Sequence, residues 1–351
     1  MTEAVGRKAR VSRNMRKHAG KVITARGAVE PAALGRVMMH EHLHLDFAQK
    51  DEIPFDLRKW DVLETNALPA LRALKGFGCN AFVDMSFPPH RAEGWVYRKI
   101  SELADFNLIL ATGFYREIEL GKYWIHEPED QIWPFLRSAS VEEIEEFCLR
   151  ECSDGIQSSG VCPGVLKAAS SASELTPVEA KAIQAVARVQ KQTGLLINTH
   201  ANTPGAFKSQ LLLIESEGVD PARVCLGHTQ LQLVEEWDDV RSCMERGAVF
   251  SLDAIYPDQA GMVLRAFDAG LGEQLVLGRD SGFKVGYREF AADPRWRQRR
   301  GDSTNLAWFG EGPPFTCFFE KVIPQYLALG ITEPMLARML VENPRRILAV
   351  Q

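Results

Sequence analysis

The sequence predicts a (β/α)8 barrel, an α/β fold of the TIM-barrel type. Short apolar or β-branched runs alternate with longer stretches of helical spacing, as expected for parallel strands buried on both faces and joined by helices. The chain has 351 residues, of which 46% are hydrophobic, and this suits a single barrel. A doubly wound sheet would place a glycine-rich phosphate turn after its first strand. This chain has HEHLHLDF there, which favours the barrel.

Eight runs are predicted as strands. Each is continuous and apolar, without the alternation of a strand that has one wet face. They span residues 36–40, 81–85, 108–112, 164–168, 195–200, 224–228, 248–252 and 275–280.

Four of the intervening stretches carry clear helical signals, at residues 62–78, 134–155, 176–194 and 233–247. The third begins with Thr176 and Pro177, which suit the N-cap and first helical positions, and it ends at Gly194. Ser138 or Ser140 would cap the second, since acidic residues follow in its first turn.

Residues 1–32 are predicted to lie outside the barrel, which is assigned to 33–351 as one domain. The first 21 residues are basic and lack the apolar core of a secretory signal. We expect a mobile tail, with an organelle transit peptide as the alternative, and a small hairpin at 21–29. Two long loops, 46–61 and 281–313, are predicted either to serve a site or to be disordered.

The composition excludes several classes of protein. A net charge of −5 argues against a dedicated nucleic-acid binder or a membrane-surface protein. No apolar stretch approaches the roughly 20 residues that cross a bilayer. Seven cysteines without CxxC pairing indicate reduced thiols and a cytoplasmic location. No nucleic-acid or membrane partner is expected, and the expected partner is a small-molecule substrate.

Ionisable side chains gather at the predicted strand ends, where barrel active sites lie. A single histidine or aspartate there is more often a hydrogen-bonded structural residue than a ligand, but five strands ending this way together favour a site. A lysine at the end of a buried strand is unusual, because burial of an unpaired ammonium is costly. The residues are His40 with His42 just beyond it, Lys167, His200, His228 and Asp280.

These residue types point to a metal centre. Imidazole and carboxylate bind divalent transition metals, and His40 and His42 share one face of a strand because they are two residues apart. A protonated lysine has no acceptor and cannot be a ligand. Lys167 therefore needs a neutral amine, an ion-pair partner or a modified side chain, and the residues alone leave these three open.

Six motifs together carry a resemblance to a known family. They are MHEH (39–42), GVLKAA (164–169), INTHAN (197–202), RVCLGH (223–228), LGRD (277–280) and VENPRRIL (341–348). In this combination and order the chain resembles the phosphotriesterase family of the amidohydrolase superfamily, from about residue 33 to the C-terminus. It looks closer to the phosphotriesterase-related and lactonase-like branches. The resemblance implies a barrel with a binuclear metal centre and a homodimer.

The resemblance also implies a role for each of the six side chains. His40, His42 and Asp280 would hold the more buried ion, and His200 and His228 the more exposed one. Lys167 would be an N6-carboxylysine that bridges both. Zinc is favoured, with manganese, cobalt and iron as alternatives.

The implied chemistry is attack by a metal-bridging hydroxide on a carbonyl or phosphoryl centre, with Asp280 accepting the proton. Lys167, as the bridge, is the other catalytic residue. Glu41 faces away from its two histidine neighbours on the strand and is given no catalytic role. His44 falls beyond the predicted strand end and is expected to be a loop residue or one that supports a ligand.

A carboxylic ester or lactone is the expected substrate. The alternatives are an amide, such as an N-acyl amino acid or sulfonate, a phosphotriester, and a non-catalytic binding protein on the same barrel. Ala254 stands where lactonase-like relatives have an arginine, which disfavours a long-chain lactone. The candidate substrate contacts are Tyr115, Tyr256, Tyr287, Arg288 and Trp308.

Overall fold

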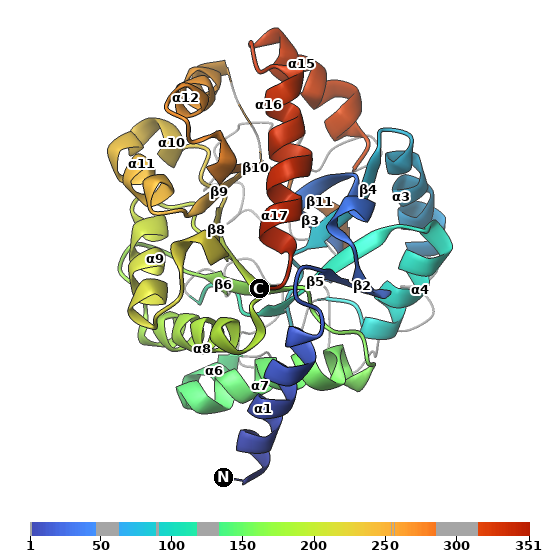
Figure 1. Cartoon of the computed structure of the whole chain (residues 1–351), viewed down its shortest axis with the longest axis vertical. Helices are drawn as coiled ribbons and strands as arrows, with labels where there is room; N and C mark the ends of the chain where they lie inside the picture. The colour runs from blue at the N-terminus through green and yellow to red at the C-terminus, as the bar shows by residue number, and fades with distance from the viewer. Residues whose placement is uncertain are drawn as a thin grey trace.

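The predicted barrel is confirmed by a computed structural model, which describes residues 2–46, 63–88, 91–117, 133–253, 255, 257–285 and 315–351. Parallel strands lie at the centre with helices around them (Figure 1). The strand order is β10-β9-β8-β7-β6-β5-β4-β3-β11. The bounds are β3 Arg36–Asp46, β4 Cys79–Asp84, β5 Asn107–Gly113, β6 Val165–Ala169, β7 Leu196–His200, β8 Val224–Gly227, β9 Val249–Leu252, β10 Leu275–Leu277 and β11 Ser281–Val285.

The two edges of this sheet meet, which closes the barrel. β11 follows β10 after a three-residue turn, 278–280, and pairs in parallel with β3 at the opposite edge. Within the turn, the N–H of Gly278 donates to Leu252 of β9 and the N–H of Asp280 donates to His40 of β3. The turn after β10 is therefore the seam of the barrel.

Helical segments follow the barrel strands except β10, which leads into β11, and Figure 1 shows α8, α9 and α11 on one side of the strands and α3 and α4 on the other. The α-helices are α3 Leu68–Lys75, α4 Gly94–Ala104, α6 Trp133–Ser138, α7 Val141–Asp154, α8 Pro177–Thr193, α9 Ala206–Ser216, α10 Gln232–Glu235, α11 Trp237–Glu245, α12 Pro257–Asp268, α15 Ile323–Ala328, α16 Glu333–Ala337 and α17 Asn343–Leu348. Short 3-10 or π segments are η1 Pro31–Leu34, η2 Leu63–Ala67, η4 Ile156–Ser158, η5 Pro221–Arg223, η6 Gly272–Gln274, η8 Phe318–Val322 and η9 Arg338–Glu342.

The helix ends follow the predicted capping signals. Thr176 caps α8 in a reciprocal capping box with Glu179, and Gly194 ends it in the left-handed conformation. Of the two serines proposed for the second helix, Ser140 is the cap, again with a capping box. The predicted 134–155 helix is accordingly two helices, because this cap starts a new one. The predicted 233–247 helix is also divided, at Glu236, whose backbone leaves the helical region.

The N-terminal segment differs from the mobile tail that was expected. Residues Thr2–Arg16 form helix α1, which packs beside α7 (Figure 1). Val11 and Met15 of this helix are buried, and Arg7 binds the carboxylates of Glu146 and Asp154. Arg7, Lys8 and Arg10 are therefore matched by acids on α7. The predicted hairpin is present as β1 Val22–Thr24 and β2 Gly27–Val29, which pair antiparallel.

Introducing a charge at Val11 should detach α1. Val11→Asp would bury an unpaired carboxylate in an apolar contact, so we expect a loss of about 2–4 kcal/mol in stability. Hydrogen exchange should show lost protection in residues 2–16, while the barrel strands stay protected. Arg13→Asp, on the same helix, is the control. Unchanged protection of α1 in Val11→Asp would show that the docking does not depend on this contact.

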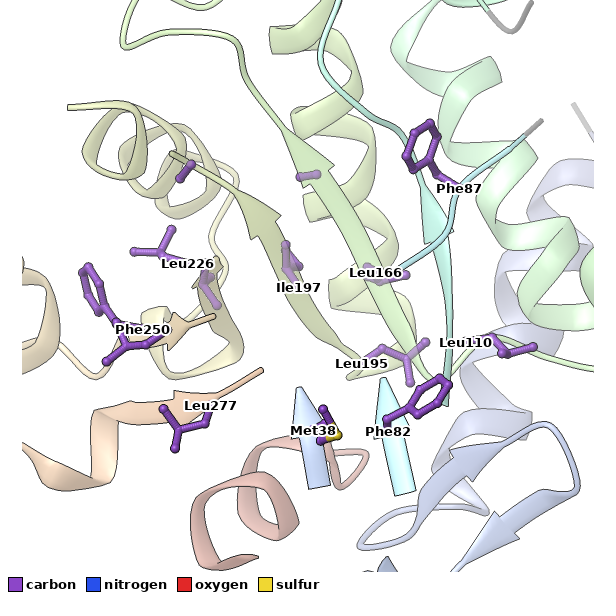
Figure 2. Packing of buried hydrophobic residues seen from close by; sticks show 14 of the residues in the cluster. Met38, Phe82, Phe87, Leu110, Leu166, Leu195, Ile197, Leu226, Phe250 and Leu277 are labelled. Carbon is purple, nitrogen blue, oxygen red and sulfur yellow. The ribbon is translucent and has the colours of Figure 1, made fainter. Parts of the chain in front are cut away.

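The barrel strands present apolar side chains to both faces, which gives two clusters of buried residues. The outer cluster joins the strands to the helices, and Figure 2 shows members from Met38 on β3 through Leu166 on β6 to Leu277 on β10. The inner cluster fills the barrel with alternate residues of the same strands, joined by Ile347 and Leu348 of α17. This double burial explains why the strands read as continuous apolar runs.

No helix among the described residues is long and apolar enough to cross a membrane. All seven cysteines are free thiols, and five of them are buried.

Candidate metal centre

Four imidazoles meet at the carboxyl ends of the barrel strands. The ring centroids of His40 and His228 are 4.3 Å apart, those of His228 and His200 are 4.2 Å apart, and those of His40 and His42 are 5.6 Å apart. All four side chains are buried. Residues from β3, β7 and the end of β8, far apart in sequence, thus form one cluster at the mouth of the barrel.

The alternation of β3 does not by itself direct its histidines into this cluster. Val37 and Met39 belong to the inner apolar cluster, so they face the barrel interior. Strict alternation from these two residues would turn Glu41 inward and the two histidines outward. The structure shows the opposite arrangement, which requires an irregularity in the strand.

A bulge in β3 supplies that irregularity. Met38 pairs with Phe82 of β4, and the next pair is Glu41 with Asp84. Three steps along β3 therefore match two steps along β4, which is one extra residue in β3. Bulges near active sites re-aim side chains in this way. The extra residue moves both histidines of the HEH motif to the inner side.

Two of the site residues have backbones in the left-handed region. His228 follows β8 with a φ of 61°, and Asp280 lies in the seam turn with a φ of 53°. This conformation is uncommon outside glycine and tends to occur where function imposes it. Both residues are thereby turned at strand ends instead of continuing the sheet.

Three of these side chains can hold one ion. Ligand atoms of His40, His42 and Asp280 lie within 4.8 Å of one another. Nε2 of His42 is 3.1 Å from Oδ1 of Asp280. A second group, formed by His40, His228 and Asp253, also has metal-ligand spacing. In that group the Asp253 carboxylate is hydrogen-bonded to Nδ1 of His228. Nε2 is therefore the His228 atom that is left to bind an ion.

The donor atoms fit a metal ion. Within the described part of the chain, Nδ1 of His40 and Nε2 of His200 are buried and have no hydrogen-bond partner. Such orphaned buried atoms are rare in proteins and call for an explanation. Burial, then the neighbouring His228, lowers the pKa of His40 and of His200 well below the usual value, so both rings are neutral at physiological pH. Neutral imidazole is the form that binds metals.

Lys167 lies beside the cluster, at the position that the sequence predicted. It is on β6, only 1% exposed, and its Nζ donates to the backbone oxygen of Met85 at 2.6 Å. Nζ lies 5.1 Å from the centroid of Phe87 and 5.4 Å from that of Tyr115. The Tyr115 ring in turn lies 5.0 Å from the ring of His200. The Lys167 amine, beside these two aromatic rings, therefore lies within the site.

The remaining predicted residues divide into three cases. Tyr115 is at the site. His44 was expected beyond the strand, but β3 continues to Asp46 because its far end pairs with β11, and His44 is buried within the strand. It is not a member of either ligand group in the described residues. The other candidate contacts, and position 254, lie outside the described residues: Tyr256, Tyr287, Arg288 and Trp308.

Sequence reasoning missed the residues that orient two of the candidate ligands, His42 and His228. Ser86 Oγ is 3.0 Å from Nδ1 of His42, and Asp84 accepts from the N–H of Ser86 at 2.9 Å. Asp253 holds His228, as described above. Each lies within one residue of the end of a predicted strand, so strand-end position was an available signal. Their polar side chains did not stand out, because a lone Asp or Ser there usually begins a turn.

Asp253→Asn tests the support of His228. The amide can still accept from Nδ1, but it carries no charge to fix the ring and raise its basicity. We expect a 10- to 100-fold loss of zinc affinity, the usual cost of changing a partner behind a ligand. Chelator competition measures it. Asp239→Asn, at an exposed ion pair with Lys208, is the control and should bind zinc like wild type. Equal affinity in both variants would contradict a supporting role for Asp253.

Comparison with known proteins gives a consistent set of relatives. A model of the phosphotriesterase family matches residues 20–348. A phosphotriesterase homology protein of Mycobacterium tuberculosis is 28% identical over 346 residues, covering 92% of this chain and 96% of that protein. An aryldialkylphosphatase of Saccharolobus solfataricus is 23% identical, covering 92% and 98%. The human N-acetyltaurine hydrolase is 22% identical, covering 93% and 97%.

Solved structures agree with the sequence relatives. A triple mutant of the organophosphorus hydrolase of Deinococcus radiodurans superposes with a TM-score of 0.76 at 25% identity. The match covers 93% of this chain and 97% of that one. The likeness therefore extends over the whole barrel.

Proposed function

Because the chain belongs to the phosphotriesterase family and resembles an organophosphorus hydrolase in structure, we propose that it is a hydrolase with two divalent metal ions that cleaves a carboxylic ester or lactone. The observation that carries the metal dependence is the pair of buried, orphaned imidazole nitrogens beside the His40, His42 and Asp280 group. Without an ion, those buried polar atoms would cost stability and gain nothing.

The residues would divide between two ions. His40, His42 and Asp280 would hold one, and His200 and His228 the other. Lys167, carried as an N6-carboxylysine, would bridge them, which is one of the three forms that its donor-only ammonium requires. When bound, the ions would supply a nucleophilic hydroxide near neutral pH and an electrophile for the substrate oxygen. Zinc is the proposed metal, since imidazole and carboxylate both suit it.

The chain's own groups would do the rest. Asp280, whose Oδ1 lies 3.1 Å from Nε2 of His42, would accept the proton of the attacking water and pass it to the leaving group. Asp253 would hold His228 in one orientation through the reaction. Tyr115, beside His200, would bound the pocket where the substrate carbonyl lies. The family likeness is also the basis for proposing a homodimer and a cytoplasmic location.

An amide of an anionic amine is the second candidate. Arg116 is buried, its guanidinium lies 5.3 Å from the centroid of Tyr115, and it donates to Oδ1 of Asn202 at 3.1 Å. A guanidinium one ring away from His200 suits a substrate carboxylate or sulfonate, since arginine binds both in a bidentate manner. The N-acetyltaurine hydrolases among the relatives make this substrate class worth testing.

Metal analysis and a substrate panel test the proposal. Purified protein supplemented with zinc should hold two equivalents. In a panel of lactones, aryl esters, N-acyl amino acids, N-acyl sulfonates and phosphotriesters, an ester or a lactone should be hydrolysed fastest. The amide candidate is supported instead if the N-acyl compounds are hydrolysed fastest and Arg116→Gln raises the KM of these compounds selectively. A protein that holds far less than two equivalents and hydrolyses nothing in the panel would refute metal-dependent hydrolysis and leave a binding protein.

A further inference from the structure

Glu41 stands between the two histidines of the HEH motif and has no part in either ligand group. Its side chain is fully buried, at 0% exposed. One carboxylate oxygen accepts from the backbone N–H of Arg279 at 2.8 Å, and the other accepts from that of Ser281 at 2.8 Å. A buried carboxylate is normally costly, so its place here needs a reason.

The two N–H groups that Glu41 holds lie on either side of Asp280. Asp280 itself donates its N–H to the backbone oxygen of His40 at 2.8 Å. Three consecutive N–H groups, those of residues 279–281 at the end of the seam turn and the start of β11, are thus bound by two consecutive residues of β3. The residue at the centre of this arrangement is the one with a left-handed backbone.

Close packing around the turn leaves little other freedom. A side chain at Gly278 would meet the backbone nitrogen of His40 at 2.9 Å. A side chain at Gly282 would run into the backbone oxygen of His42. The backbone therefore lies directly against β3 on both sides of Asp280, and the Glu41 carboxylate holds the two residues next to Asp280.

We infer that Glu41 is a positioning residue, which holds the backbone of Asp280 in its left-handed conformation so that this carboxylate meets His42 at the metal site. Strained backbone persists only when its surroundings over-determine it, and the two bonds from Glu41 supply that constraint. The inference rests on the proposed metal centre. It assigns a function to the middle residue of the motif, which strand alternation alone left without one.

The same device occurs on the opposite flank of β3. The Asp84 carboxylate accepts from the N–H of Leu43 at 2.6 Å and from that of Ser86 at 2.9 Å. Ser86 then contacts His42. Buried carboxylates thus fix the backbone on both sides of His42, each by bridging two N–H groups.

A purely structural role, closing the barrel seam, is the competing explanation. It predicts a loss of stability and no specific effect on metal binding. A matched control distinguishes the two. Asn343 is a buried side chain that donates to the backbone oxygens of Gly272 and Leu275, next to the start of β10. Asn343 therefore binds the start of β10, the strand that leads into the seam turn, at the end away from the site.

The experiment compares Glu41→Gln with Asn343→Asp in the full-length protein. Each substitution exchanges an oxygen and an amide nitrogen. In Glu41→Gln the new donor faces a backbone N–H, and in Asn343→Asp the new acceptor faces backbone oxygens. Zinc affinity is measured by chelator competition, and the apo-protein Tm is measured by calorimetry. Glu41→Gln should weaken at least one of the two zinc-binding steps 10- to 100-fold. Asn343→Asp should lower the Tm and bind zinc within about twofold of wild type. Glu41→Asp, which keeps the charge but shortens the reach, carries the same comparison if Glu41→Gln does not fold.

Zinc affinity of the Glu41 variants equal to wild type, or lowered no more than in Asn343→Asp, would overturn the inference and leave Glu41 as a seam residue. Wild-type protein that binds no zinc at all would instead refute the proposed function, and this inference with it. The wild-type measurement therefore separates the two failures.

Discussion

Replacing Lys167 with methionine is expected to leave a folded barrel that hydrolyses its best substrate at least ~1,000-fold more slowly. Methionine has a similar length and fills the space between Phe87 and Tyr115, so packing is kept. It cannot carry a carboxylate, so the proposed bridge between the ions is lost. A 1,000-fold loss corresponds to about 4 kcal/mol of transition-state stabilisation, within the several kcal/mol that metal-ion catalysis supplies.

Three measurements check this expectation: kcat/KM, zinc equivalents and Tm. The variant should hold less zinc than wild type at the same supplementation. Lys181→Met is the matched control, because Lys181 also donates its ammonium to backbone oxygens, at 2.8 Å from Ala139, but lies away from the site. It should be as active as wild type. A Lys167→Met protein with full zinc content and unchanged kcat/KM would show that the amine is a structural group only.

Gly113→Ala is expected to cost roughly 2–6 kcal/mol of stability, enough to leave little soluble protein. Gly113 ends β5 with a φ of 128°, a region that side chains rarely adopt, at a cost of about 1–3 kcal/mol. Its Cβ would also run into the backbone oxygen of Lys167 and approach its carbonyl carbon to 2.8 Å. Overpacking of this kind costs about 1–3 kcal/mol more.

Gly27→Ala separates strain from crowding. Gly27 has a φ of 108°, but a side chain there meets nothing within 4 Å. It should lose only the conformational part, and chemical denaturation of both variants measures the difference. The displaced β6 should also reduce zinc binding in any folded Gly113→Ala, because that strand carries Lys167. A stability loss no larger than that of Gly27→Ala would contradict the close approach of β5 and β6.

The fold was predictable because each strand is buried on both faces and each helix has a local capping signal. On β6 and β7 the site residues follow the simple alternation of a strand. Val165 and Lys167 keep simple alternation on β6, as do Leu196 and His200 on β7, so inward apolar residues lead directly to inward site residues. On these strands, the position of a residue along the chain determines whether its side chain faces the barrel interior.

The bulge in β3 was not predictable from the residues themselves. In a strand that is apolar on both faces, the pattern of residues does not show which side chains face the barrel interior. Nothing in VMMHEH marks the extra residue between Met38 and Glu41. The family likeness indicated which side the histidines face, and the pairing with β4 explains how. The role of the seam turn was hidden for a related reason, since Glu41 and Ser281 are 240 residues apart.

The helix at the N-terminus shows a different limit. Its basic residues predict a solvated tail when read alone, since long-range partners cannot be seen in sequence. In the structure, Arg7 and Lys8 bind acids of α7, and Val11 supplies an apolar contact. The acids that neutralise the segment lie more than 130 residues away.

Diffraction from zinc-loaded crystals, recorded on both sides of the zinc absorption edge, tests the binuclear centre most directly. We predict two anomalous peaks at the mouth of the barrel, one contacting His40, His42 and Asp280 and the other contacting His200 and His228, with continuous density from Lys167 between them. No peak at the mouth, or a single peak with an unmodified Lys167 still bonded to Met85, would contradict a binuclear centre.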